Sequence, residues 1–139
     1  MNKIIQSVFL LLLFFFSVSV MSACLDEGDK VTLTGVLKQE TIYGPPGWGE
    51  HPQNDEKINY WFLYPDRVPE CFNAVDDTRH YSKKMQIIMV DDQYNEYRMF
   101  LEKDVKLSGQ IMFANSPYHS TPVLIFHVSG VELMKGGDN

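Results

Sequence analysis

The chain has 139 residues and an acidic balance, with 18 Asp and Glu against 12 Lys and Arg, and its net charge is −6. A negative chain without a basic stripe is a poor partner for phosphate backbones, so the composition argues against nucleic-acid binding. Hydrophobic residues make up 45% of the chain and aromatic residues 13%, which is enough for a packed core and argues against disorder.

Residues 1–23 have the pattern of a secretory signal peptide. Lys3 supplies the positive charge, residues 4–20 (IIQSVFLLLLFFFSVSV) are apolar, and two small residues before Cys24 predict cleavage there. A transmembrane anchor is the alternative, because the apolar segment approaches the roughly 17–25 residues that a spanning helix needs. We expect cleavage, and therefore an exported protein that is periplasmic or secreted and has no transmembrane segment after cleavage.

Two cysteines, Cys24 and Cys71, follow the predicted signal. An even pair in an oxidising compartment suggests a disulfide. The competing interpretation is lipidation of Cys24, as in an outer-membrane lipoprotein, because this cysteine directly follows small residues at the cleavage position. Met21 stands where a lipoprotein signal usually has an aliphatic residue, so the disulfide is favoured and lipidation stays open.

Two segments share the pattern Val-x-Leu-hydroxyl-Gly-x-aliphatic, namely VTLTGVL at 31–37 and VKLSGQI at 105–111. Apolar and polar residues alternate in both, which predicts half-buried strands. Gly35 and Gly109 fall at inward-facing positions in mid-strand, where glycine usually marks a bulge or a sharp bend. Strands that bend in this way can serve two walls of a small barrel, although two ordinary strands can share such a motif by chance.

Three further strands are predicted at 58–65, 83–90 and 121–133, because these segments are rich in β-branched and aromatic residues. Residues 91–103 (DDQYNEYRMFLEK) have apolar positions at helical spacing, with Asp91 or Asp92 as the expected N-cap.

The resulting order is three strands, one helix and two strands, which is the layout of an OB-fold. We therefore predict a mainly β fold over residues 24–133, a small five-stranded OB-like β-barrel with one short helix between strands 3 and 4. A β-sandwich, or another small β-barrel with one helix, is the alternative. Residues 134–139 are expected to form a flexible tail.

The sequence resembles a family of small exported bacterial proteins known as domain of unknown function 4431. The segments that carry the resemblance are CL at 24–25, VTLTGVLKQET at 31–41, YGPPGWGE at 43–50, YWFLYPDRVPECF at 60–72, VKLSGQI at 105–111 and HSTPVLI at 119–125. The family has no established activity, so the resemblance implies no mechanism. At the level of the fold, the strand order is also similar to that of bacterial periplasmic OB-fold proteins, which does not imply a shared function.

The resemblance also bears on the cysteines and on one histidine. The family has an early cysteine and another after the second strand, and Cys24 and Cys71 match them, which supports the disulfide. The family often has a histidine-rich turn before its Thr-Pro-Val element. Here that turn contains only His119, which weakens a metal-binding interpretation.

In an OB-fold, the loops that join strands 1 and 2 and strands 4 and 5 lie on the same side and commonly frame the binding face. These loops are residues 43–57 and 114–121. Aromatic rings with a few hydrogen-bonding groups suit sugars, peptide edges or flat ligands. The predicted ligand- or partner-binding residues are Tyr43, Trp48, His51, Tyr118 and His119. Alternatively, Tyr43 and Trp48 fold back over the barrel mouth as a lid on the core.

The predicted function is a binding or interaction module of the periplasm or cell envelope, whose partner is a small ligand or an envelope protein. The alternative is a metal-assisted hydrolase using His51 and His119 with Glu50 or Asp55. No His-x-His or Cys-x-x-Cys spacing supports a metal site, and no Gly-x-Ser-x-Gly turn supports a nucleophile, so we predict no catalytic residue, metal or cofactor. His127, within an apolar run, is expected to be a hydrogen-bonded strand residue.

Overall fold

The computed structural model describes residues 24–73 and 83–135. The predicted signal peptide and most of the predicted tail lie outside these residues. The strands are β1 (Lys30–Tyr43), β2 (Lys57–Pro65), β3 (Met85–Ile87), β4 (Asp104–Phe113) and β5 (Val123–Leu133), and the helices are α2 (Asp91–Glu96) and the 3-10 helix η2 (Tyr97–Phe100).

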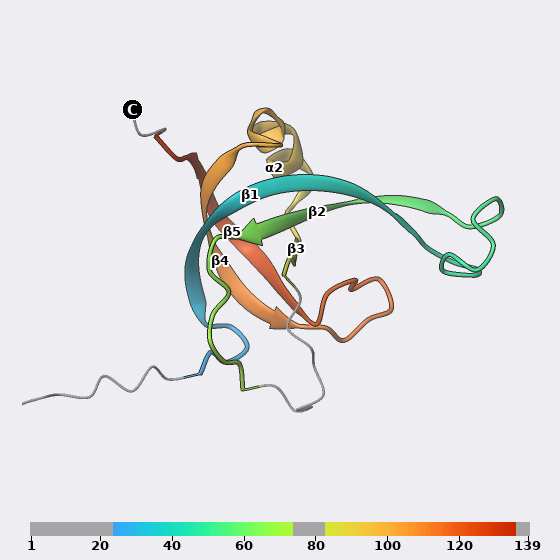
Figure 1. Cartoon of the computed structure of the whole chain (residues 1–139), viewed down its shortest axis with the longest axis horizontal. Coiled ribbons are helices and arrows are strands. Elements are labelled where there is room, and N and C mark those ends of the chain that lie inside the picture. Colours follow the sequence, from blue (N-terminus) through green and yellow to red (C-terminus); the bar gives the residue numbers. More distant parts are fainter. Residues whose placement is uncertain (1–23, 74–82, 136–139) are drawn as a thin grey trace, which may run out of the picture.

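The five strands form a closed barrel in the order β1-β2-β3-β5-β4, and β4 pairs back onto β1 (Figure 1). The β3–β5 pair is parallel and the other pairs are antiparallel. The helical segment lies between β3 and β4. The predicted mainly β, five-stranded barrel with one short helix between strands 3 and 4 is therefore confirmed.

Gly35 is the point where β1 passes from one wall of the barrel to the other. It pairs with Val105 of β4 on one side and with Pro65 of β2 on the other. A Cβ atom at this position would lie 2.1 Å from the carbonyl oxygen of Tyr64. Only glycine fits so close to the neighbouring backbone, at the position where β1 changes its pairing partner from β4 to β2.

Gly109 has the matching place in β4. The register between β4 and β5 shifts between Ser108 and Gln110, on either side of this buried glycine. A Cβ atom on Gly109 would lie 2.5 Å from the Cγ2 atom of Ile125. The predicted irregularity in the second of the two similar segments is therefore confirmed as well.

Alternation along the strands fills the barrel with apolar side chains. The buried core cluster contains Leu37, Trp61, Leu63, Phe72, Met85, Ile87, Met89, Tyr97, Val105, Leu107, Ile111, Val123, Ile125, Val128 and Val131. Phe62 and Leu124 are also fully buried but are not members of this cluster. They belong to the outer face of the sheet, so this face carries buried apolar surface of its own.

The helical segment differs from the prediction in its cap and its length. Val90 is the N-cap residue, and its amide donates to the side-chain oxygen of Gln93 at 3.3 Å. Asp91 and Asp92 instead occupy the first turn, where the positive end of the helix dipole favours acidic side chains. Tyr94 packs edge-to-face on Trp61 with ring centroids 5.4 Å apart, so the helix closes the core at this end.

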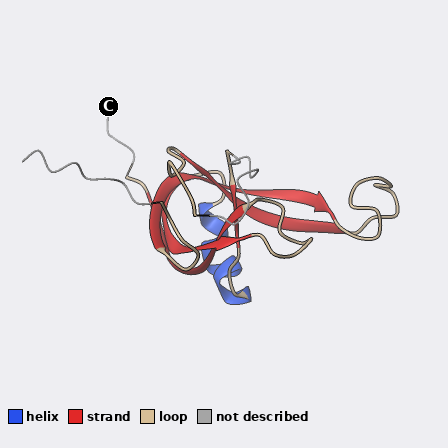
Figure 2. Ribbon diagram, turned by 90° about the horizontal axis from the view of Figure 1, so that it is seen from below, coloured by secondary structure: helices blue, strands red, loops and turns tan. Residues whose placement is uncertain are grey.

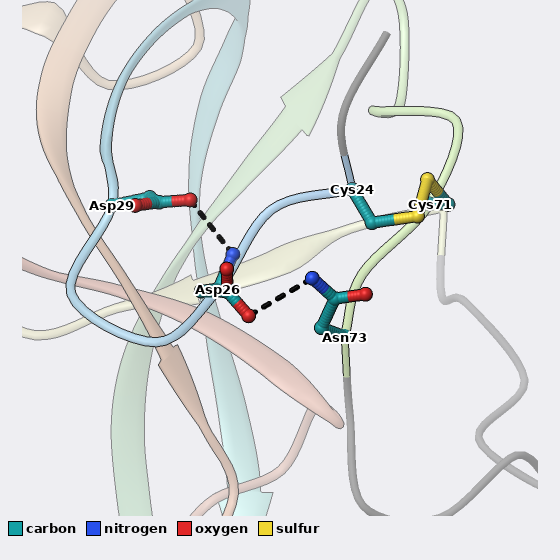
Figure 3. The surroundings of a disulfide bond; sticks show 5 residues. All are labelled: Cys24, Asp26, Asp29, Cys71 and Asn73. Atoms are coloured by element: carbon teal, nitrogen blue, oxygen red, sulfur yellow. Dashed lines mark hydrogen bonds between the residues drawn. A yellow bond between two sulfur atoms is a disulfide. The ribbon is translucent and has the colours of Figure 1, made fainter. Parts of the chain in front are cut away.

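A disulfide joins Cys24 to Cys71, as predicted. Beside it, Leu25 and Phe72 form an isolated parallel bridge. The Asn73 side chain donates to the Asp26 carboxylate at 2.9 Å (Figure 3). The beginning of the described chain is thereby tied to the segment that follows β2.

The β1–β2 hairpin extends beyond the barrel as a two-stranded arm. Residues 35–43 of β1 pair with 57–65 of β2, whereas β3 pairs only with residues 61–63. Figure 2 shows these two ribbons running out from the curved part of the sheet. The arm places the loop between β1 and β2 at its tip.

Candidate functional site

The β1–β2 loop (residues 43–57) is organised around the carboxylate of Asp55. This side chain accepts hydrogen bonds from the backbone amides of Gly47 and Gly49, both at 2.8 Å, and from that of His51 at 3.2 Å. Asp55 is only 7% exposed. Desolvation on burial acts to raise the pKa of Asp55, but these three hydrogen bonds outweigh it and lower the pKa below its ordinary value.

Trp48 occupies the centre of this loop in the left-handed backbone region, with φ of 52°. Its own amide donates to the carbonyl of Gly44 at 2.9 Å, and its two neighbours both donate to Asp55. This conformation costs a residue with a side chain about 1–2 kcal/mol, so the surrounding contacts must hold it there. These contacts hold the backbone in this conformation, while Trp48 itself is 42% exposed.

The β4–β5 loop (residues 114–121) is anchored by a buried glutamine of β3. The Gln86 side-chain oxygen accepts from the Ser120 amide at 2.7 Å, and its amide nitrogen donates to the Tyr118 carbonyl at 3.4 Å. Thr121 accepts from the Gln86 backbone amide at 2.9 Å and donates to the Val123 carbonyl at 2.8 Å. The loop is therefore fixed at its base, while the Tyr118 side chain is 46% exposed.

The two loops meet through their aromatic rings. The ring centroids of Trp48 and Tyr118 lie 5.2 Å apart at an interplanar angle of 68°, which is an edge-to-face contact. The prediction that the two loops lie near each other is therefore confirmed by this contact.

The other three predicted site residues interact within their own loops. Tyr43 is half-buried at the end of β1, and a Cβ atom on Gly49 would lie 3.8 Å from its Cβ atom. His51 is exposed, and its backbone belongs to the Asp55 network. The Nδ1 atom of His119 accepts from the Asn115 amide at 3.1 Å. The structure thus brings Trp48 and Tyr118 together, and it gives the two histidines local roles.

The lid interpretation places Tyr43 and Trp48 on the core. In the described part of the chain, the partly buried hydrophobic residues that pack on the core are Leu25, Val31, Leu33, Tyr94, Phe100, Leu101 and Phe113. Trp48 instead packs on Tyr118. Trp61 belongs to the core cluster, and Tyr94 packs against it.

Sequence reasoning missed Tyr60, which lies on the outer face of β2 next to this site. Its ring centroid is 6.5 Å from that of Phe62. Its hydroxyl is buried and has no hydrogen-bond partner in the structure. Burial raises the pKa of Tyr60, and the nearby Tyr118 and Glu56 raise it further. The alternation of side chains in INYWFLYP (58–65) could have identified Tyr60, because it places Tyr60 and Phe62 on the face of the strand opposite to Trp61.

A charged cluster covers the same outer face one step further along β2. Lys84 lies 2.6 Å from a carboxylate oxygen of Glu40 and 4.2 Å from the ring centroid of Phe62. The Tyr64 hydroxyl donates to the other oxygen of Glu40. This cover helps to explain why Phe62 is fully buried outside the barrel.

The pKa values of this cluster shift in the directions expected for an ion pair. Desolvation acts to raise the pKa of Glu40, but its hydrogen bonds with Lys84 and Tyr64 prevail and lower it. Desolvation acts to lower the pKa of Lys84, and the bond to Glu40 raises it overall. The pKa of Tyr64 is raised, chiefly by its hydrogen bond to Glu40.

His127 lies at the irregularity opposite Gly109, as an exposed residue with φ of 45°. Its Nδ1 atom lies 3.1 Å from the side-chain oxygen of Gln110, and its ring lies 4.3 Å from that of Phe126. The prediction of a hydrogen-bonded strand residue is confirmed.

In residues 24–73 and 83–135, no three His, Cys, Asp or Glu side chains gather in a way that would hold a metal ion. Asp55, which the hydrolase alternative uses as a ligand, directs its carboxylate at three backbone amides of its own loop. Within the same residues, none of the helices has the length and apolar character to cross a bilayer.

Residues 84–132 match the model of a family described as a domain of unknown function (DUF4431). This match covers the chain from the residue before β3 to the end region of β5, and it confirms the resemblance predicted from the sequence. No curated protein matches the chain, and no solved structure matches it either.

Proposed function

We propose that this protein is an exported binding module of the bacterial cell envelope, which contacts a ligand or an envelope protein through its β1–β2 and β4–β5 loops. The observation that carries the proposal is the contact between Trp48 and Tyr118. Two exposed aromatic rings meet across two loops that the chain fixes from below through Asp55 and Gln86. Rings held in place before binding lose little conformational freedom when a ligand arrives, so such a pair is suited to recognition.

Export is supported by the composition of residues 1–23 and by the disulfide. Disulfides persist mainly in oxidising compartments such as the periplasm. The Cys24–Cys71 bond also uses the Cys24 sulfur atom, to which a lipid anchor would otherwise be attached. The disulfide therefore favours a protein without that anchor.

The test compares the wild-type mature protein with the double variant Trp48→Ala/His119→Ala. Each is immobilised and exposed to a bacterial envelope extract, and the retained glycans, lipids and proteins are identified by mass spectrometry. We expect the wild type to retain a component that the double variant releases. Loss of the Trp48 ring removes the larger of the two contact surfaces, so retention is expected to fall at least tenfold, which corresponds to about 1.4 kcal/mol.

The matched control is Met99→Ala, which truncates a side chain that is 66% exposed on η2, between β3 and β4. This variant is expected to retain the component as the wild type does. Both variants are expected to melt within a few degrees of the wild type. Equal retention by the wild type and the double variant contradicts the proposal, and so does unfolding of the double variant, which would assign Trp48 a covering role.

A further inference from the structure

The Tyr60 hydroxyl is the feature of this region that the fold leaves unexplained. Buried polar atoms in folded proteins are almost always hydrogen-bonded, because an unpaired one has lost its water without compensation. Among the described residues, Tyr60 is the one whose side-chain polar atom is buried without a partner. A hydroxyl kept in this state next to a candidate binding site points to a partner that arrives from outside.

The contacts of the β4–β5 loop place Tyr118 beside Tyr60. Gln86 lies directly opposite Phe62 in the β2–β3 pairing, and its side chain holds the Tyr118 carbonyl. The ring of Phe62 in turn neighbours that of Tyr60. Tyr118 contacts Trp48 edge-to-face and lies close enough to Tyr60 to help raise its pKa, so these three residues together define the aromatic site.

The charges around this site disfavour an anionic ligand. The β1–β2 loop contains Glu50, Asp55 and Glu56 against Lys57, and the β4–β5 loop (ANSPYHST) contains no Asp, Glu, Lys or Arg. A phosphate, a sulfate or a uronic acid would therefore meet net negative charge.

A cationic ligand that becomes buried at this site would also be disfavoured. The buried carboxylate of Asp55 is bonded to three backbone amides, and the half-buried carboxylate of Glu40 is bonded to Lys84 and Tyr64. Neither is available to compensate a ligand cation that becomes desolvated. The other carboxylates of the loop, Glu50 and Glu56, are exposed to solvent, where an ion pair contributes little. An uncharged ligand with hydroxyl groups avoids both of these costs and can hydrogen-bond to the Tyr60 hydroxyl.

We propose that the site takes an uncharged sugar chain, with Tyr60 as its third contact residue. The apolar face of a sugar ring lies against Trp48 and Tyr118. A displacement of the Tyr118 side chain opens the way to the Tyr60 hydroxyl, which donates a hydrogen bond to a sugar oxygen. This inference rests on the proposed function and adds the chemical class of the ligand.

The first experiment measures binding of chitotetraose and maltotetraose, two neutral tetrasaccharides, by isothermal titration calorimetry. We expect the wild-type mature protein to bind at least one of them and the Tyr60→Phe variant to bind it about tenfold more weakly, as for the loss of one hydrogen bond. The melting temperature of the ligand-free variant is expected to stay the same or to rise, because the substitution removes an unpaired buried hydroxyl.

Tyr64→Phe is the matched control, since it removes a hydroxyl from the same face of the same strand. That hydroxyl is bonded to Glu40, so its loss is expected to lower the melting temperature and to leave the affinity for the tetrasaccharide unchanged. Equal affinity of Tyr60→Phe and the wild type overturns the role of Tyr60. A lower melting temperature of Tyr60→Phe also overturns it, because the hydroxyl would then have a structural partner.

A second titration uses tetragalacturonate, an anionic sugar chain, and follows tryptophan fluorescence. Trp48 is 42% exposed and Trp61 is 4% exposed, so a ligand at the site changes the emission of Trp48 and the change disappears in Trp48→Phe. We expect tetragalacturonate to bind at least tenfold more weakly than the neutral chain. Equal binding of the anionic chain overturns the charge argument.

Failure of this inference can be told apart from failure of the proposed function. If the wild type binds neither neutral tetrasaccharide while Trp48→Ala/His119→Ala still loses an envelope component, the sugar assignment is wrong and the binding function stands. If the double variant also retains every component, both are wrong.

Discussion

Leu33 of β1 lies directly opposite Leu107 of β4, and this pair is the centre of a reciprocal arrangement. On one side of it Gly35 faces Val105, and on the other side Val31 faces Gly109. The two segments that share one sequence pattern are therefore antiparallel partners, and each glycine stands opposite the first valine of the other segment. The repeated pattern thus specifies one shared wall of the barrel.

Gly35→Ala is expected to destabilise the protein strongly. The added Cβ atom would meet the Tyr64 carbonyl oxygen at 2.1 Å and the Pro65 Cα atom at 2.7 Å, and both are backbone atoms that cannot move aside alone. We expect a loss of at least about 2 kcal/mol in the free energy of unfolding, measured by urea titration. Gly130→Ala in β5 is the control, because a Cβ atom added there would have no heavy atom within 4 Å, and its effect should stay within about 0.5 kcal/mol.

The sequence predicts the barrel well, because period-two alternation and mid-strand glycines both reflect direct packing. The ends of elements are predicted less well. β3 covers only Met85–Ile87 of the predicted 83–90, since the register with β2 and β5 offers partners to these few residues. The helix capped by Val90 rather than by Asp91 or Asp92 shows the same limit, because the choice depends on where Gln93 points.

The candidate site is predicted in part. Topology alone is enough to bring the loops of Trp48 and Tyr118 together, because an OB-like order places both on one side of the barrel. The role of Asp55 depends on the exact path of the loop, which no residue pattern specifies. The sequence suggests His51 and His119 as a pair of contact residues, yet the described contacts of His119 are within its own loop.

Asp55→Asn is expected to loosen the β1–β2 loop without unfolding the barrel. An amide side chain cannot accept from Gly47, Gly49 and His51 as a carboxylate does, because one of its two terminal atoms is a donor. We expect a more solvent-exposed Trp48, seen as a red shift of its fluorescence, and a small fall in melting temperature. Glu50→Gln, in the same loop, is the control and should leave both unchanged. An unchanged spectrum of Asp55→Asn would contradict the assigned role.

The same carboxylate predicts a pH dependence. The pKa of Asp55 in the folded protein is lower than its ordinary value, so its stabilising effect is fully present above an ordinary aspartate pKa of about 3.9 and is lost as the pH falls through the lower folded value. We expect a change in Trp48 fluorescence below about pH 4 while the far-ultraviolet circular dichroism of the barrel persists. In Asp55→Asn this acid transition should be absent. Its persistence there would assign it to another carboxylate.

Reduction of the Cys24–Cys71 disulfide is expected to lower stability. The bond closes a loop with a sequence separation of 47, for which the chain-entropy model gives about 4 kcal/mol. Urea unfolding with and without a phosphine reductant measures the difference. The double variant Cys24→Ser/Cys71→Ser should unfold at the reduced midpoint and should not respond to the reductant. Identical midpoints for the oxidised and reduced wild type would contradict the expectation.

Glu40→Gln is expected to cost about 1–2 kcal/mol, because it weakens charge-assisted hydrogen bonds from Lys84 and Tyr64 that are partly shielded from water. In the wild type, the contribution of Glu40 is lost as the pH falls through its lowered pKa, and that of Lys84 is lost as the pH rises through its raised pKa. Glu132→Gln breaks the more exposed pair with Lys106 and should cost less than about 0.5 kcal/mol. Equal costs in urea unfolding would refute the distinction.

The backbone at Trp48 favours a different amino acid from the one that it carries. Glycine and asparagine enter the left-handed region at lower cost than tryptophan, so selection for stability alone would replace the indole over evolutionary time. The residue that homologous chains carry at this position therefore indicates whether the tryptophan ring is under selection for something other than stability. If the proposed binding function holds, homologous chains that bind the same partner are expected to retain a large aromatic ring there, against the local preference of the backbone.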